Sequence, residues 1–582
     1  MAWTRFNKIC AINLKPSLSK VSGKAIDIAN AHFSVREVSD NKIYIRKKFQ
    51  FIMQKKDASG LDKSLKLLVK TSFIVLIGLI ISKIVAYAYR IIIARYFGPE
   101  VYGLFSLALM ISGWFIAISA LGLAEGLLRF IPVYRGRKES NKITYLFRFS
   151  LITLIATSLI SGLLLFLLSD FISLTFFHNI DLSIYLKIFS LLVPVGAIGY
   201  PFLAALRAHE EISWYSFIFN IAQNVIKLAM LLIFIVLGLN SNATTLSYLT
   251  GVFGMLVLSY CICRYKIPHI FKTHDLPHNE RKLLKKEVIS YSIPILFFGI
   301  ISTIFYWIDS FSLGYYKGAF EVGLYNSAVP IAILLGMASE VFIQLFFPMI
   351  IREYARKKMK LIEQLSKQVA KWILIVNLPI FAIMMVFPGV MINILFGSQY
   401  LAAENALRIL AIGTLVSSIF ITSNQLISMM GKSKLVLMNI IIASVINFGL
   451  NMIFVPMKKI GFIENANGLN GAALATLISI VIFNLLFMYQ AHKYLKIIPL
   501  RRKMINLIVI AVISTILLFY LRSKFISNDL FTLGVLFGLF IAVYIILILL
   551  SGALDKNDRD IIRSMWRKVS IWKKGNANLA RL

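Results

Sequence analysis

The run TSFIVLIGLIISKIVAYAYRIIIA, residues 71–94, decides the fold class of this sequence. At ~1.5 Å per residue, a helix of this length measures ~36 Å, which is enough to cross the ~30 Å hydrocarbon core of a bilayer. The run nevertheless contains Lys83 and Arg90, and a charge at the bilayer centre costs about 2.5–3.5 kcal/mol. It therefore predicts a membrane span whose two bases need an explanation.

The composition of the whole chain indicates a polytopic membrane protein. Of its 582 residues, 59% are hydrophobic and 15% are charged, and the mean hydropathy is +0.79. A water-soluble fold could not bury this much apolar surface. Lys and Arg number 62 against 26 Asp and Glu, and they cluster between the apolar runs. This pattern indicates topology signals and contacts with membrane lipids, and we expect no nucleic-acid partner.

The sequence contains no motif for catalysis or metal binding. Its cysteines, Cys10, Cys261 and Cys263, form no CxxC pair and have no ligand cluster beside them. No P-loop, HExxH or GxSxG motif occurs, and the gaps between spans are too short for an enzymatic domain. We therefore predict a protein that is not an enzyme, without catalytic residues, metal or cofactor, which works through ion gradients, substrate gradients or a partner.

Fourteen apolar runs are long enough to be transmembrane helices, so we predict an all-α fold. The runs lie near residues 72–95, 102–123, 145–169, 183–206, 212–238, 244–264, 288–313, 323–350, 369–396, 405–430, 435–456, 469–491, 504–521 and 530–551. Every second loop is rich in Lys and Arg, whereas the loops at 178–183, 238–247 and 396–405 contain none. By the positive-inside rule, the basic loops and both termini are cytoplasmic, in a protein of the cell membrane.

An internal repeat organises these spans. GPEVYGLFSLA at residues 98–108 returns as GAFEVGLYNSA at 318–328, with Gly98 aligned on Gly318 and Gly103 on Gly323. Six spans separate the copies, so both have the same orientation, which predicts two parallel six-helix bundles around a central cavity, followed by two further helices.

The predicted division of the chain follows from this repeat and from the basic flanks. The parts are a basic cytoplasmic segment (1–70), the first bundle (71–266), a basic linker (267–286), the second bundle (287–492), helices thirteen and fourteen (503–552) and a basic tail (553–582). A natural start at Met53 would make residues 1–52 an extension.

The charged residues inside the spans are the first candidates for a site. Lys83, Tyr87 and Arg90 share one helix face, because they are spaced i, i+4 and i+7. The repeat-related seventh span carries Trp307 and Asp309 at similar depth. An acid and bases on these two spans can meet across the cavity, either as a static lock or as a pair that breaks when substrate or a proton arrives. Snorkelling to the outer headgroups is the alternative for Arg90.

Further polar residues lie in four other spans. They are Asn220, Gln223, Asn224 and Lys227 in span five, Asn447 and Asn451 in span eleven, Glu340 and Gln344 in span eight, and the i, i+4 pair Glu125 and Arg129 at the end of span two. Lys227 is a candidate for the substrate cavity, and Glu340 and Gln344 for counter-charge or coupling. Interhelical hydrogen bonding is the alternative role for the amides, and an interfacial ion pair for Glu125 and Arg129.

The stretches RYFGPEVYGLFSLA (95–108) and LGLAEGLLRFIPVYRGRKE (121–139) resemble the polysaccharide-transport branch of the multidrug/oligosaccharidyl-lipid/polysaccharide exporter superfamily. The matching residues include Arg95, Gly98, Pro99, Tyr102, Gly103 and Arg129. The resemblance implies two bundles around a cationic cavity that takes the sugar-diphosphate head of a polyprenyl-linked oligosaccharide. Polysaccharide assembly proteins would then be partners.

On this resemblance we expect a flippase for cell-surface glycan assembly, with Lys83, Arg90 and Lys227 facing the diphosphate and Tyr87 and Trp307 facing sugars. Coupling to a proton or sodium gradient would use the acidic residues. A cation-coupled multidrug exporter is the first alternative, and it would need an acidic, aromatic pocket. A membrane glycosyltransferase or polymerase and a structural scaffold are the others.

The orientation can be tested by thiol labelling. In a cysteine-free background, Asn242→Cys and Ser398→Cys should react with an impermeant reagent added outside sealed cells, because both positions lie in loops without Lys or Arg. Asn279→Cys, in a basic loop, should react only after the cells are opened. Equal labelling of all three in sealed cells would contradict the assignment.

Overall fold

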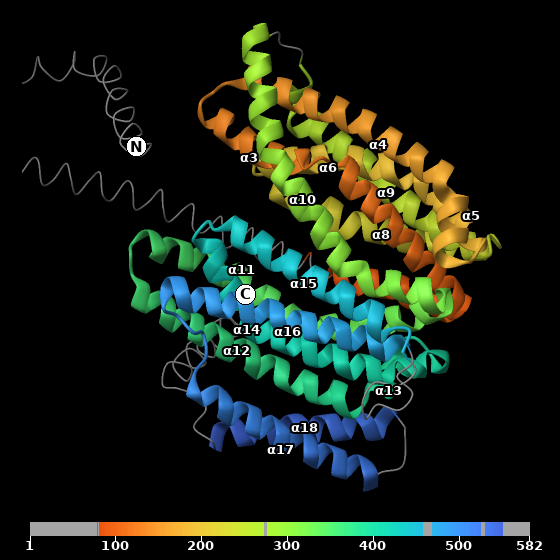
Figure 1. Ribbon diagram of the computed structural model, residues 1–582, viewed down its shortest axis with the longest axis vertical. Helices are drawn as coiled ribbons and strands as arrows, with labels where there is room; N and C mark the ends of the chain where they lie inside the picture. The colour runs from red at the N-terminus through yellow and green to blue at the C-terminus, as the bar shows by residue number, and fades with distance from the viewer. Residues whose placement is uncertain (1–77, 79–80, 273–275, 458–467, 525–529, 551–582) are drawn as a thin grey trace, which may run out of the picture. The chain divides into compact units, whose positions relative to one another are not determined.

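The computed structural model describes residues 78, 81–272, 276–457, 468–524 and 530–550, and their regular structure is entirely helical (Figure 1). The chain divides into two units, residues 1–73 and 74–582, of which only the second contains described residues. The predicted segment 1–70 and tail 553–582 therefore lie outside the described residues.

The first half of the described chain comprises the helical run Ile81–Ser119 and the helices up to α9. After Ile81–Ser119 come α3 (Leu123–Gly136), α4 (Ser140–Phe177), α5 (Asp181–Ser190), α6 (Leu192–Ala208), α7 (Ile212–Ser216), a π-helical turn (Phe217–Ala222), α8 (Gln223–Val236), α9 (Asn242–Lys266) and a 3₁₀ turn (Pro268–Phe271).

The second half comprises α10 to α16, and two helices follow it. These elements are α10 (His278–Lys317), α11 (Ala319–Ala355), α12 (Met359–Val386), α13 (Pro388–Leu395), a 3₁₀ turn (Ser398–Ala403), α14 (Glu404–Met429), α15 (Ser433–Phe454), α16 (Gly468–Leu495), α17 (Arg502–Lys524) and α18 (Leu530–Leu550). α17 packs on α12 through Met504 and Leu507.

The predicted all-α membrane fold is confirmed. In the described residues, twelve helices are long and apolar enough to cross a bilayer, and Phe537–Leu550 is a shorter apolar stretch. One of the twelve, Ile81–Ser119, folds back on itself: the rings of Tyr89 and Phe105 are 6.0 Å apart, whereas sixteen residues of straight helix would separate them by ~24 Å. The count of fourteen spans stays a prediction.

The two copies of the repeat form the same turn. Gly98 has a φ of 83° and Gly318 a φ of 91°. Residues with a Cβ rarely adopt this backbone conformation. At each glycine one helix ends and the next folds back beside it. The sequence match between 98–108 and 318–328 thus corresponds to two equivalent helical hairpins.

The hairpins also touch one another, backbone to backbone. A Cβ added to Gly103 would lie 1.8 Å from the carbonyl oxygen of Ala319, and one added to Gly323 would lie 2.0 Å from that of Pro99. Only glycine allows such an approach. The two repeat copies therefore meet through the residues that define the repeat.

The long helix α10 contacts both halves. Near its start, Ser292 packs against Gly122 and Gly126 of the first half, where an added Cβ would lie within 3 Å of Ser292 atoms. Further along, Asp309 reaches α11, α15 and α16 of the second half. α10 thereby connects the two halves along its length (Figure 1).

We predict that Gly103→Ala lowers the free energy of unfolding by about 1–3 kcal/mol, because the methyl group must push the two hairpins apart. Gly113→Ala on the same helix is the matched control, since nothing lies within 4 Å of its added Cβ. The control should be neutral or stabilising by up to about 1 kcal/mol. Thermal unfolding of the purified variants measures both, and equal stability would show that the contact is not tight.

Candidate functional site

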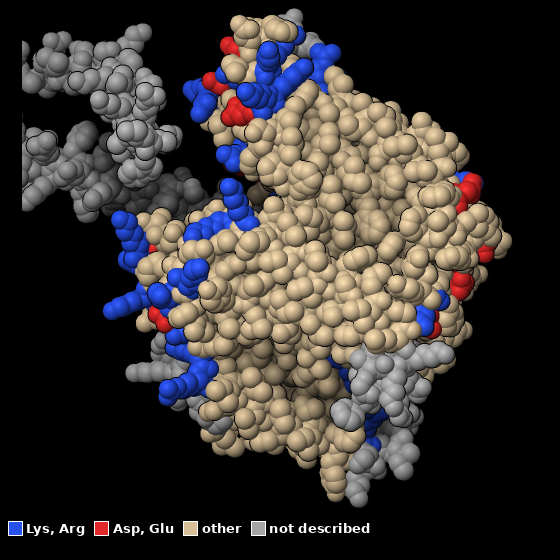
Figure 2. Space-filling model, in the orientation of Figure 1, with Lys and Arg blue, Asp and Glu red and all other residues tan. Residues whose placement is uncertain are grey.

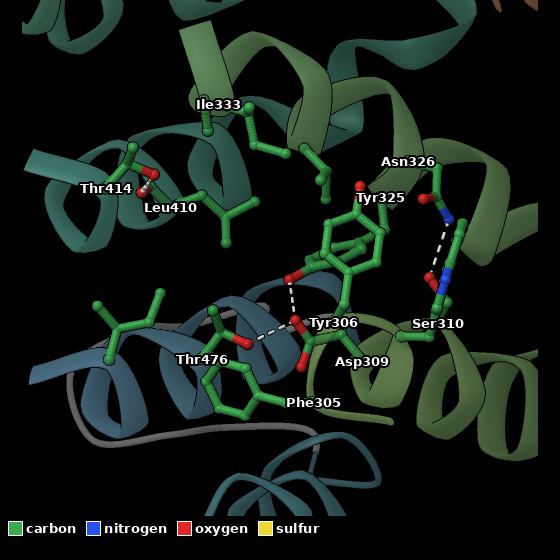
Figure 3. Close-up of a pocket in the computed structure, with 14 residues that line it drawn as sticks. Phe305, Tyr306, Asp309, Ser310, Tyr325, Asn326, Ile333, Leu410, Thr414 and Thr476 are labelled. Carbon is green, nitrogen blue, oxygen red and sulfur yellow. Dashed lines mark hydrogen bonds between the residues drawn. The ribbon is translucent and has the colours of Figure 1, made fainter. Parts of the chain in front are cut away.

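Asp309 lies at the centre of a polar cluster inside the second half (Figure 3). Its carboxylate accepts hydrogen bonds from the Tyr325 hydroxyl at 2.6 Å, the Thr476 hydroxyl at 2.5 Å and the Asn451 amide at 2.9 Å. These donors come from α11, α16 and α15. Asp309 is 7% exposed, so three neutral donors take the place of water around a buried carboxylate.

The repeat explains the local geometry of this cluster. In the register that aligns Gly98 with Gly318, Asp309 and Tyr325 correspond to Tyr89 and Phe105, whose rings touch across the first hairpin. In the second hairpin the equivalent positions hold the carboxylate of Asp309 and the phenol of Tyr325. An aromatic contact in one half is thereby replaced by a hydrogen bond in the other.

The cluster also contains an unused acceptor. Asn451 Oδ1 is buried without a hydrogen-bond partner, although its amide nitrogen donates to Asp309 and to Asn447 Oδ1. A cavity of about 150 Å³ adjoins the cluster, and Trp307 and Thr476 are among its lining residues. Carboxylate, hydroxyl and amide oxygens are ligands for hard cations. This group of oxygens could hold a small monovalent cation or a proton.

A site for a transition metal is not formed in the part of the chain that the structure describes. Among those residues, no three His, Cys, Asp or Glu side chains converge.

The first and second halves share an ion pair between Lys83 and Glu340. Lys83 Nζ lies 3.8 Å from Glu340 Oε1, and the two side chains are 31% and 47% exposed. The expected pair between Asp309 and Lys83 or Arg90 is not formed, because the donors of its own half enclose Asp309. Glu340 is therefore the counter-charge that Lys83 meets.

Arg90 and Tyr87 point toward the second half. The Tyr87 hydroxyl donates to the carbonyl oxygen of Pro330 at 2.8 Å. Arg90 interacts electrostatically with tyrosines of both halves, Tyr102 and Tyr306 included. This placement differs from a side chain that snorkels to the headgroups.

Lys227 is buried among side chains of the first half. It is 8% exposed, and its Nζ lies 4.2 Å from the centre of the Tyr248 ring and 3.3 Å from Asn224 Oδ1. Gly251 makes room for it, since an added Cβ would be 2.1 Å from Lys227 Cγ. The structure thus places this base against Tyr248 and Asn224, and its role in the central cavity stays a prediction.

The amides of span five bond both to another helix and within their own span. The Asn224 amide donates to Ser82 Oγ of the first helix at 3.0 Å, and the Asn220 amide to Ser216 Oγ at 3.1 Å. Gln223 is buried beside them, and Gln344 lies one turn from Glu340 on α11. Asn220 belongs to the π-helical turn Phe217–Ala222, which the spacing of the sequence did not reveal.

The residues of the 95–108 stretch hold the two halves together. The Arg95 guanidinium donates to the carbonyl oxygens of Leu395 at 2.9 Å and Asn393 at 3.1 Å, at the end of α13, where a cation is favoured. The Tyr102 hydroxyl donates to Asn326 O at 3.1 Å. Together with Gly103, they form a closed contact between the halves.

Arg129 is placed differently from the expectation. Its guanidinium lies 4.2 Å from the centre of the Tyr291 ring, and among the ion pairs of the described residues it forms none with Glu125. A cation over an aromatic ring replaces the predicted i, i+4 pair.

Sequence reasoning missed Tyr325 and Thr476. Tyr325 could have been found, because it matches Phe105 in the repeat and adds a hydroxyl. Thr476 gives no signal, since it is 167 residues from Asp309 and a threonine in an apolar span is common.

Comparison with protein families confirms the resemblance. Residues 68–354 match the family described as polysaccharide biosynthesis protein, and residues 294–453 match the MatE family. An uncharacterized membrane protein of Methanocaldococcus jannaschii is 25% identical over 78% of this chain and 91% of its own length. A putative O-antigen transporter of Shigella flexneri is 22% identical over 63% of this chain and 86% of its own length.

Solved structures show the same fold. The lipid II flippase MurJ in an inward closed conformation has a TM-score of 0.65 and 16% identity, covering 82% of this chain and 98% of its own. An inward-facing multidrug resistance MATE transporter of the MOP superfamily has a TM-score of 0.58 and 17% identity, covering 73% and 98%.

The ion pair between the halves should contribute little to stability. Because both side chains are partly exposed, Lys83→Gln and Glu340→Gln should each lower the free energy of unfolding by less than about 1 kcal/mol. The double variant Lys83→Glu with Glu340→Lys should match the wild type. A loss several times larger in either single variant would assign the pair a locking role.

Proposed function

We propose that this chain, a multi-pass membrane transporter of the multidrug/oligosaccharidyl-lipid/polysaccharide exporter superfamily, is a flippase rather than an enzyme. Its substrate is a polyprenyl-diphosphate-linked oligosaccharide, which it moves from the cytoplasmic to the outer leaflet of the cell membrane by alternating access. The substrate feeds cell-surface glycan assembly.

The observation that carries the proposal is the partly exposed base at the junction of the halves. Lys83 reaches Glu340 across that junction and keeps 31% exposure, so a substrate phosphate can compete for its ammonium group. Arg90 lies seven residues further along the same helix face, and its guanidinium suits bidentate binding of phosphate oxygens. Tyr87 and Trp307 supply aromatic faces for sugars.

Asp309 serves coupling in this proposal. Its buried carboxylate and the free Asn451 Oδ1 are oxygens for sodium or for a proton from the gradient. Binding there changes the charge at the helix α10, which contacts both halves. A small charge change in the second half can thus influence the junction with the first half.

The multidrug exporter is the second candidate, and one observation favours it. Phe305, Tyr306, Trp307 and Asp309 together make an acidic, aromatic pocket, as a cationic drug would need. The cavity measures about 150 Å³, however, whereas drug-sized ligands occupy about 300–1,000 Å³. The pocket fits an ion better than a drug.

Flipping of a fluorescent lipid-linked oligosaccharide in proteoliposomes tests the proposal. We expect Lys83→Gln to lose at least about tenfold in rate with normal stability, because it loses a phosphate contact of about 1.5–3 kcal/mol. Asp309→Asn should fold, but its flipping rate should no longer respond to imposed sodium or pH gradients. The reason is that the amide, unlike the carboxylate, cannot gain and lose a proton or carry a negative charge.

The outcomes separate the alternatives. Wild-type flipping by Lys83→Gln would remove the phosphate role, and a wild-type gradient response by Asp309→Asn would remove the coupling role. Transport of a cationic dye without flipping of the lipid-linked sugar would favour the exporter.

A further inference from the structure

A second, larger cavity lies apart from Asp309 and from the Lys83–Glu340 pair. It measures about 660 Å³ and is bounded by α3 and α10 on one side and by the end of α14 and the start of α15 on the other. Its walls therefore belong to both halves. A volume of this size accommodates a small organic ligand.

The lining of this cavity is divided by chemistry. Arg129 and Lys434 are its charged residues, and no acidic residue lines it; Ser290 and Ser433 add hydroxyls. Further along α10 and α15 the lining is apolar, with Ile295, Phe298 and Leu437 among its residues. The cavity is thus basic and polar at one side and hydrocarbon-like at the other.

The two bases are free to bind an anion. Tyr291 supports the Arg129 guanidinium from one face, with 4.2 Å between the guanidinium carbon and the ring centre. Within the described part of the chain, neither Arg129 nor Lys434 has a carboxylate partner. A stacked guanidinium keeps its N–H edge available, and that edge matches phosphate oxygens.

The wall of the cavity formed by α10 is exposed. Phe298 is 40% exposed, and Ser290 and Pro294 of the same helix are exposed as well. The basic side chains of the protein also gather mostly along one edge of the face drawn in Figure 2. In a membrane protein, such an edge lies at the level of lipid phosphates, and the apolar side chains beside it lie at the level of the chains.

We propose that this cavity binds an anionic phospholipid, with its phosphate between Arg129 and Lys434 and the start of an acyl chain against Ile295, Phe298 and Leu437. The absence of acidic lining residues selects an anionic headgroup, and the apolar wall selects a lipid over a free anion. Because the bound lipid touches both halves, the content of anionic lipid would influence how far they separate at this place. The site is independent of the transported substrate.

Thiol protection in nanodiscs tests the site on the full chain. In a background with Cys10, Cys261 and Cys263 replaced by serine, Ser433→Cys should react more slowly as phosphatidylglycerol replaces phosphatidylcholine. Arg129→Gln and Lys434→Gln should each raise the phosphatidylglycerol fraction needed for half-protection about fivefold, because each base near a membrane surface contributes about 1 kcal/mol.

Arg137→Gln is the matched control, because Arg137 is an exposed base just after α3 that does not line the cavity. It should behave like the parent. Lys434→Gln keeps the test valid if Arg129→Gln misfolds, since Lys434 is exposed and touches no ring.

Three outcomes would overturn the proposal. Equal protection by phosphatidylcholine alone would show an apolar crevice without headgroup selection. Equal protection by inorganic phosphate would identify a free-anion site. If Arg137→Gln had the same effect as Arg129→Gln, the response would come from general surface charge and not from this cavity.

Discussion

The backbone contact between Gly103 and Gly323 is the constraint on which the other contacts between the halves depend. A carbonyl oxygen of the opposite hairpin occupies the space of each missing side chain, so the hairpins can approach no closer and tolerate no larger residue. This approach brings Tyr102 within reach of Asn326 O and Arg95 within reach of the end of α13. Most of these contacts involve backbone atoms.

The other contacts between the halves vary in character. Lys83 and Glu340 form a partly exposed ion pair, which contributes about 1 kcal/mol at most, whereas Ser292 of α10 packs closely against Gly122 and Gly126. Near α3 and the start of α15, a cavity separates the walls. The contact between the halves is therefore tight at the glycines and looser at the Lys83–Glu340 pair and at this cavity.

The repeat carries opposite charges in its two copies. In the same repeat register, Lys227 of the first half corresponds to Asn447, next to the Asp309 cluster of the second half. Lys227 lies over an aromatic ring, whereas Asp309 is held by hydroxyl and amide donors. One scaffold thus buries a base in one half and an acid in the other.

The helical membrane fold, the repeat and the two glycine turns were predictable from the sequence, because long apolar runs and glycine placement act through local chain physics. It also identified Asp309 and Lys83 as unusual, since charge in a span is costly wherever it points. Their partners follow from the packing of the helices. Asp309 meets Thr476 from 167 residues away, and Lys83 meets Glu340, because pairing between helices depends on how each helix is rotated and packed, which the spacing within one helix does not specify.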